Sequence, residues 1–240
     1  MRQQYLQHTP GCSSLLVFFA GWGAEPCMFT QTDSLHEATS GRDLLVCWDY
    51  RDLSLDAGLL RRYSDIRVMA WSMGVWAAGR VLGSAGLSSL PVSAAIAVCG
   101  TPSPIDDSKG IPEAIFDGTL AGLSERTLIK FRRRMCGSAE ALDQLMSCGL
   151  TRSVEELREE LAAIGSQVRE GVSTDSNLES GLRLSWSQAI VGSRDMIFPP
   201  ANQQAAWESL GVPVRLVDSA HYDTRLFQSL LYEEDPWTRI

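Results

Sequence analysis

The residues best suited to chemistry in this sequence surround Ser72. The string Trp71-Ser72-Met73-Gly74 follows the apolar run 66–70 and precedes a run of small residues, 75–80, with helical character. A strand, a tight turn that carries serine and then a helix form a nucleophile elbow, which lifts the hydroxyl out of the sheet. The usual pattern is Gly-x-Ser-x-Gly, and Ala70 occupies its first slot here. We therefore predict that Ser72 is a nucleophile.

A serine nucleophile needs a base, and histidine is the usual one because its pKa is near neutrality. The chain has three histidines. His8 precedes a Pro-Gly turn and His36 lies in a polar connection, so we interpret both as surface residues. His221 follows the last expected strand, at a sheet edge where open α/β folds bind ligands. It is the candidate base.

The imidazole in turn needs a carboxylate that fixes its tautomer and stabilises the imidazolium. Asp195 follows the expected strand 188–191 and precedes a Pro-Pro pair. Asp218 and Asp223 are nearer to the histidine in sequence, but residues of the same short loop are poorly placed to reach the far ring nitrogen. We therefore favour Asp195. The resulting chain order, serine, aspartate, histidine, is that of α/β-hydrolases.

Two backbone N–H groups are candidates for an oxyanion hole. The loop after the first expected strand reads Ala20-Gly21-Trp22-Gly23, and its glycines permit unusual backbone angles. The N–H of Trp22 could therefore point into the site. The second donor would be the N–H of Met73, which follows the nucleophile and opens the helix.

The elements that must position these residues follow from short apolar runs that alternate with helical stretches. The runs are rich in Val, Ile and Leu, which is typical of strands buried on both faces in a parallel sheet. They predict a doubly wound α/β fold. The expected strands are Ser13–Ala20, Asp43–Trp48, Ile66–Ala70, Val92–Cys99, Gln188–Val191 and Val212–Val217.

Residues 101–184 interrupt this alternation. They contain no convincing strand and two helical patterns, Ser124–Met135 and Ser153–Arg169, the second opened by a possible capping box between Ser153 and Glu156. The polar stretch 166–181 is expected to be a loop. We predict a sheet core formed by residues 1–100 and 185–240, with 101–184 inserted above the carboxyl edge of the sheet as a helical cap.

Composition narrows the function classes. The 240-residue chain has a net charge of −8, which disfavours a general nucleic-acid binder. Its six cysteines lack a Cys-x-x-Cys pair and are expected to be free thiols in a reducing compartment. The start of the sequence lacks the apolar core of a signal peptide, and no apolar run is long enough for a membrane span, so a cytoplasmic protein is expected. No metal-ligand spacing is evident, and we expect neither a metal nor an organic cofactor.

Several short sequence strings resemble those of one family and go beyond what all proteins of this fold share. They are residues 18–23, 71–76, 99–112, 115–120 and 130–137. The strings Gly-Thr-Pro-x-Pro-Ile-Asp-Asp and Phe-Arg-Arg-Arg-Met-Cys-Gly are the specific ones, whereas the elbow is generic to α/β-hydrolases. Together they resemble the BioG group of pimeloyl-acyl-carrier-protein methyl ester esterases of biotin synthesis.

This resemblance implies hydrolysis of the methyl ester on a pimeloyl chain carried by an acyl carrier protein. Ser72 would attack the ester, and His221 would take its proton and return it to methanol. The carrier protein is then the expected partner. Four basic residues at helical spacing, Arg126, Lys130, Arg133 and Arg134, form either a solvated helix face or a docking surface for that acidic partner.

Two alternatives remain open. The first is a generic carboxylesterase or thioesterase of the same fold, which would share the catalytic residues and differ in substrate. The second is a catalytically inactive binding module, which an active-serine phosphonate probe would fail to label.

Overall fold

A seven-stranded sheet forms the centre of the computed structural model, which describes residues 1–30, 41–84, 87, 89–174 and 184–238. The strand order is β1-β3-β2-β4-β5-β6-β7, and all neighbours are parallel except β1 and β3. The bounds are β1 Arg2–Gln7, β2 Ser14–Phe19, β3 Asp43–Trp48, β4 Asp65–Trp71, β5 Val92–Val98, β6 Gln188–Gly192 and β7 Val214–Val217. The predicted, mainly parallel sheet is confirmed.

The central strands bury both faces, which explains their nearly continuous apolar sequence. In β2, Leu15, Val17 and Phe19 belong to one apolar cluster, whereas Leu16 and Phe18 belong to another. Alternate side chains of a strand point to opposite faces, so the two clusters are the cores above and below the sheet. Helices therefore have to cover both faces.

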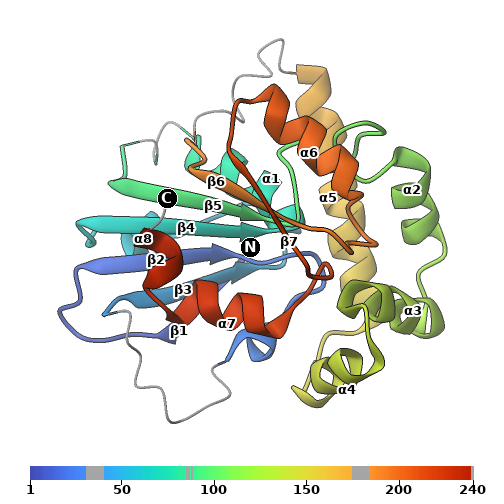
Figure 1. Cartoon of the computed structure of the whole chain (residues 1–240), viewed down its shortest axis with the longest axis horizontal. Helices are drawn as coiled ribbons and strands as arrows, with labels where there is room; N and C mark the ends of the chain where they lie inside the picture. The colour runs from blue at the N-terminus through green and yellow to red at the C-terminus, as the bar shows by residue number, and fades with distance from the viewer. Residues whose placement is uncertain (31–40, 85–86, 88, 175–183, 239–240) are drawn as a thin grey trace.

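Two groups of helices provide this cover (Figure 1). Helices α1 (Met73–Leu82) and α6 (Pro200–Ser209) contribute Trp76 and Trp207 to the first cluster. Helix α7 (Thr224–Tyr232) and the short α8 (Asp235–Thr238) contribute Phe227 and Trp237 to the second. Two short 3-10 helices, η1 (Pro26–Phe29) and η2 (Ala57–Leu59), complete the connections.

Strand β1 was not expected from the sequence. Its residues, RQQYLQ, are mostly polar; the first four alternate between exposed and half-buried positions, and the last two are half-buried. An edge strand buries only one face and gains much of its stability from backbone hydrogen bonds to its neighbour, so it lacks the apolar run that marked the other strands. It pairs antiparallel with β3, with Arg2 opposite Trp48 and Tyr5 opposite Leu45.

The residues between β5 and β6 form four helices among those described, where two were expected. They are α2 (Glu113–Ala121), α3 (Glu125–Cys136), α4 (Ala139–Ser147) and α5 (Val154–Thr174). The first buries only Phe116 and the third only Leu142 and Leu145, which is too sparse a pattern to reveal a helix by periodicity. Figure 1 shows these helices gathered at the edge of the sheet where the parallel strands end.

The expected loop over 166–181 is wrong for residues 166–174, which continue α5; residues 175–183 lie outside the described part. The helix continues because Val168 is buried and Gln167 donates a 3.0 Å hydrogen bond to the carbonyl of Tyr50. At its other end the predicted capping box is confirmed, since Ser153 and Glu156 bond to each other's backbone N–H groups at 3.0 and 3.2 Å.

Two further findings bear on the composition. All six cysteines are free thiols, and Cys47, Cys99 and Cys136 are buried. Within the described ranges, none of the helices combines the length and the apolar composition needed to cross a bilayer.

Candidate active site

Ser72 lies in a strained turn between β4 and α1. Its backbone has φ 58° and ψ −127°, a combination rare for any residue but glycine, and α1 begins at the next residue. Small neighbours make the turn possible. A Cβ on Gly74 would lie 2.2 Å from the carbonyl oxygen of Phe19, and one on Gly100 would lie 2.4 Å from that of Ser72. The turn therefore has the geometry expected of a nucleophile elbow.

Replacing Gly74 with alanine is expected to lower the free energy of unfolding by about 3 kcal/mol or more, because the methyl group has only backbone to displace. In thermal unfolding this corresponds to a Tm decrease of about 6 °C or more. Gly118→Ala in α2 is the matched control, since nothing lies within 4 Å of its added Cβ. An unchanged Tm for Gly74→Ala would contradict the tight contact between elbow and β2.

Ser72, His221 and Asp195 meet at the carboxyl edge of the sheet. The His221 Nε2 atom lies 3.0 Å from Ser72 Oγ, and its Nδ1 atom lies 2.8 Å from Asp195 Oδ2. Each residue follows a different strand, β4, β6 or β7. All three are buried, with exposed fractions of 5% or less. Parallel strands ending at one edge thus bring together residues 149 positions apart.

The Asp195 carboxylate is held from both sides. Its Oδ1 accepts hydrogen bonds from the backbone N–H groups of Ile197 and Phe198 at 2.8 and 2.9 Å. Its Oδ2 accepts one from Gln203 Nε2 at 3.0 Å as well as the bond from His221. Four donors fix its orientation.

The two other aspartates considered for this role are engaged elsewhere. Asp223 caps α7, because its Oδ1 accepts from the N–H groups of Arg225 and Leu226. The exposed Asp218 pairs with Arg194 at 2.7 Å. Asp195 is accordingly the carboxylate that contacts His221.

The imidazole is packed between aromatic side chains that the sequence did not single out. The ring of Phe198 is stacked parallel to it, and the Trp71 indole donates a 2.9 Å hydrogen bond to the His221 carbonyl. Trp71 directly precedes the elbow, so its position was a usable signal. Neither Phe198 nor the aspartate's partner Gln203 belongs to a recognisable motif, and only the fold brings them to the site.

The loop formed by residues 20–23, called here the oxyanion loop, runs directly beside the elbow. A Cβ on Gly21 would lie 3.0 Å from the Cβ of Ser72. Trp22 and Met73 both line the cavity that contains Ser72 and His221. Among the described residues, neither backbone N–H group finds a hydrogen-bond acceptor. The oxyanion hole predicted for Trp22 and Met73 would require two donors of this kind.

A buried thiol, that of Cys99, lies close to Asp195 and His221. The Cys99 sulfur and ligand atoms of Asp195 and His221 all lie within 4.8 Å of one another. Three such atoms at this spacing could in principle surround a metal ion. Burial and the nearby aspartate raise the pKa of Cys99 well above its usual value, so the sulfur stays a neutral thiol. Metals bind thiolates, and His221 Nδ1 already bonds Asp195, so the set fits a metal poorly.

A narrow apolar cavity opens onto Ser72. It has a volume of about 40 Å³, and its walls include Phe116, Phe131 and Leu161 from the inserted helices. Ile115 and Met196 also line it, and each is 55% exposed, so they mark its opening. A molecule that entered this cavity would meet mainly apolar side chains beside Ser72.

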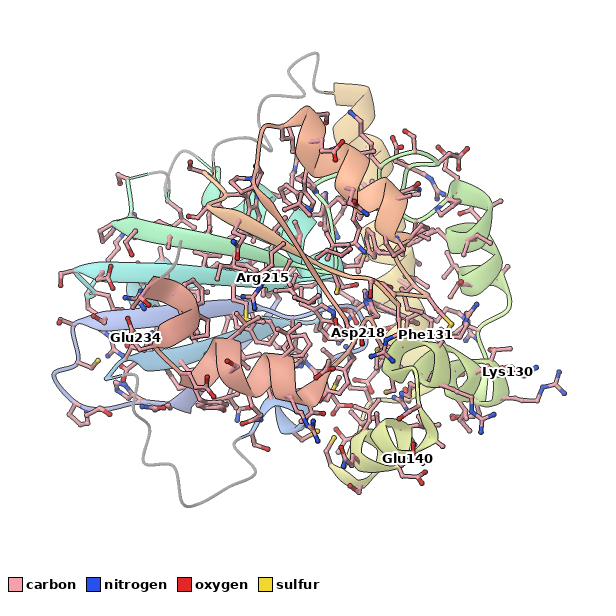
Figure 2. All side chains as sticks on the ribbon, viewed as in Figure 1. Lys130, Phe131, Glu140, Arg215, Asp218 and Glu234 are labelled. Carbon is pink, nitrogen blue, oxygen red and sulfur yellow. The ribbon has the colours of Figure 1, made fainter. Side chains whose placement is uncertain are left out.

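The four basic residues predicted to form a docking surface all lie on α3. Arg126, Lys130, Arg133 and Arg134 are exposed, and none of their side chains has a hydrogen bond or ion pair with another residue of the described ranges. Arg134 differs from the rest because it also lines the cavity that contains Ser72 and His221. Figure 2 shows Lys130 on the outer side of α3 and Phe131 on the side toward the sheet.

The remaining histidines take no part in this site. His8 pairs with Asp43 at 2.7 Å, at the start of β3 and so at the opposite edge of the sheet. His36 lies outside the described residues.

Comparisons with known proteins agree with this geometry. The chain is 46% identical over 225 residues to a malonyl-[acyl-carrier protein] O-methyltransferase of Bacteroides fragilis (strain 638R). The match covers 92% of this chain but 43% of that relative, so the chain spans less than half of the relative's length. Among solved structures, BioG from Haemophilus influenzae superposes with a TM-score of 0.81 at 36% identity, covering 97% of this chain and 100% of that one.

More distant structures share the fold alone. MGS-M2, an alpha/beta hydrolase enzyme from a Medee basin deep-sea metagenome library, matches with a TM-score of 0.60 at 14% identity, over 96% of this chain and 92% of that one. The model of the family described as pimeloyl-ACP methyl esterase BioG matches residues 1–232. The chain therefore belongs to the BioG family of pimeloyl-ACP methyl esterases and has the α/β-hydrolase fold.

Proposed function

We propose that this chain is a serine esterase that hydrolyses the methyl ester of pimeloyl-[acyl-carrier protein], releasing methanol and the free acid for biotin synthesis. The observation that carries the proposal is the continuous relay from Ser72 Oγ through His221 to Asp195, with contacts of 3.0 and 2.8 Å. The family to which the chain belongs supplies the substrate.

The relay supports acylation as the first step. His221 Nε2 accepts the Ser72 proton while the oxygen attacks the ester carbonyl. Asp195, bonded to Nδ1, stabilises the imidazolium that forms. The backbone N–H groups of Trp22 and Met73 stabilise the oxyanion, and the position of Met73 at the N-terminus of α1 adds the favourable end of the helix dipole.

The second half of the reaction reverses these roles. The imidazolium gives its proton to the departing methoxide, so methanol leaves and an acyl-serine remains. Water then enters, His221 removes its proton, and the acyl-enzyme is hydrolysed. The product carries a carboxylate where the substrate had a neutral ester. The apolar cavity walls favour the neutral end and disfavour the charged one, which promotes product release.

The substrate distinguishes this proposal from a generic carboxylesterase or thioesterase of the same fold. The relative named as a methyltransferase acts, by its name, on a carrier-bound acyl group, although that name describes a protein more than twice as long as the matched part. A generic esterase would hydrolyse a short nitrophenyl ester at least as efficiently as carrier-bound methyl pimelate. We expect the carrier-bound ester to have the higher kcat/KM.

We further propose that residues 101–184 act as a cap that receives the carrier protein on the α3 basic face, formed by Arg126, Lys130, Arg133 and Arg134. Carrier proteins are acidic and present a phosphopantetheine phosphate, which arginine binds well. The protein itself is acidic, so a single basic face would orient the partner during encounter. Arg134, on the cavity wall, is suited to the phosphate that enters with the arm.

Reversing one charge of this face should weaken turnover of the carrier-bound ester specifically. For Arg133→Glu we expect kcat/KM for pimeloyl-carrier methyl ester to fall about tenfold or more, because repulsion of an acidic partner slows association. Activity on a nitrophenyl ester should change less than about twofold, since the reaction machinery is intact. Steady-state kinetics on both substrates provide the measurement.

The matched control is Arg215→Glu on β7, another exposed arginine with the same change of charge, placed away from α3 (Figure 2). It should leave both activities nearly unchanged. Equal losses for Arg133→Glu and Arg215→Glu would rule out the α3 face as the docking surface and leave only an effect of net charge.

A further inference from the structure

The oxyanion loop is held in place by the inserted helix α5. The Trp22 indole donates a 2.8 Å hydrogen bond to the carbonyl of Leu157, and the next N–H, that of Gly23, points to Glu160 Oε2 at 3.4 Å. These partners lie more than 130 residues away in sequence. The position of Trp22, and hence of its backbone N–H, therefore depends on α5.

Glu160 is a fully buried carboxylate at the centre of these contacts. Besides Gly23, it accepts a 3.0 Å bond from the Tyr50 N–H on Oε1 and a 2.7 Å bond from Arg152 on Oε2. Arg152 is itself buried and also lies 3.5 Å from Asp49. Every oxygen of the carboxylate thus has a donor, as a charge in the interior requires.

Tyr50 connects the same cluster to the other end of the loop. Its hydroxyl donates a 2.6 Å bond to the carbonyl of Ala20, the first residue of the oxyanion loop. Its backbone N–H bonds Glu160. The loop is consequently fixed at Ala20 through Tyr50 and at Gly23 through Glu160.

A contribution to folding stability is a weak explanation for the buried polar cluster of Glu160, Arg152 and Tyr50. Burial raises the pKa of Glu160, an unfavourable effect that the positive charge of Arg152 and the Tyr50 N–H oppose. Replacing a buried ion pair by apolar residues of similar size is often neutral or stabilising. Apolar residues could not, however, make directional hydrogen bonds to the backbone of residues 20–23, next to the reacting serine.

We infer that Glu160 and Tyr50 are positioning residues that hold the oxyanion loop so that the Trp22 N–H points at the developing oxyanion. This inference rests on the proposed function, because it takes Trp22 as an oxyanion donor. Neither side chain touches the substrate, and both act through the loop backbone. The inserted helices would then contribute to the rate of the reaction as well as to binding.

Glu160→Gln tests the inference with a side chain of nearly the same size. The amide keeps one oxygen but places NH₂ among donors, opposite either Arg152 and the Gly23 N–H or the Tyr50 N–H, so the loop loses an anchor. We expect kcat for a nitrophenyl ester to fall roughly tenfold to a hundredfold, less than for removal of an oxyanion donor outright. KM should change less than about threefold, because the cavity walls are unaltered.

Glu159→Gln is the matched control. Glu159 is the neighbouring residue, but its carboxylate is exposed and, among the described residues, pairs with Arg51. The substitution should leave kcat unchanged. Tyr50→Phe provides a second variant in case Glu160→Gln fails to fold. It removes the hydroxyl, and with it the bond to Ala20 and a longer 3.3 Å bond to the carbonyl of Cys47. It should lower kcat about threefold to tenfold at constant KM.

Active enzyme should be counted by titration with a serine-directed phosphonate, so that kcat refers to folded sites. Normalised kcat values equal to wild type, whatever the Tm, would overturn the inference and reduce the cluster to a structural role. If wild-type protein neither hydrolyses the ester nor binds the phosphonate, the proposed function itself fails. The two failures are therefore distinct.

Discussion

Replacing Ser72 with alanine is expected to reduce ester turnover by at least about 10⁴-fold, for small and carrier-bound substrates alike. The substitution removes the attacking oxygen but leaves the oxyanion loop and the cavity in place. Any residual rate would come from water attack assisted by these groups. Alanine should also be accommodated, because the elbow already holds a Cβ at φ 58°.

Labelling with a serine-directed phosphonate, followed by peptide mass spectrometry, checks the same residue independently of turnover. The label should be found on the peptide containing Ser72 in wild type and should be absent from Ser72→Ala. Ser147→Ala, at the exposed end of α4, serves as the control and should be labelled like wild type. A labelled Ser72→Ala would place the nucleophile elsewhere, whereas unlabelled wild type would favour the binding-module alternative.

The second large effect is expected for Asp195→Asn, which should lower kcat about 10⁴-fold. The new amide would direct an N–H toward His221 Nδ1, at the 2.8 Å position where the carboxylate now accepts a hydrogen bond. The imidazole would then carry its proton on Nε2, so it could no longer accept the Ser72 proton. The measurement is kcat at neutral pH, with Tm recorded to show that the fold is retained.

Asp223→Asn is the matched control, because it lies two residues from His221 and makes no contact with it among the described interactions. Asparagine caps helices as well as aspartate does, so both Tm and kcat should remain near wild type. A large loss of kcat in Asp223→Asn together with a small loss in Asp195→Asn would show that Asp223, and not Asp195, is the carboxylate that supports His221.

Much of the fold was predictable because its main elements have recognisable patterns in short stretches of the sequence. The central strands each carry a nearly continuous apolar run, and the elbow needs small residues at fixed spacing around Ser72. The candidate residues Asp195 and His221 could then be found because each lies a few residues after an expected strand. Parallel topology brings the carboxyl ends of these strands to one edge of the sheet. The position of a residue after a strand was therefore enough to restrict the candidates for the base and the carboxylate.

The rest depended on contacts that have no local pattern. Strand β1 is recognisable only beside β3, which it pairs with as an edge strand. Helix α5 continues to Thr174 through its contact with Tyr50, and nothing in residues 166–174 themselves marks that extension. Likewise, the anchoring of residues 20–23 by Glu160 joins two segments that no sequence motif connects.

The most direct test of the proposed chemistry is mass spectrometry of pimeloyl-carrier methyl ester after incubation with the protein. We expect the carrier to lose the mass of one methylene group, with methanol released and the thioester to phosphopantetheine intact, and Ser72→Ala to leave the substrate unchanged. A carrier that keeps its methyl ester, or that loses the whole acyl chain through thioester cleavage, would contradict the assignment.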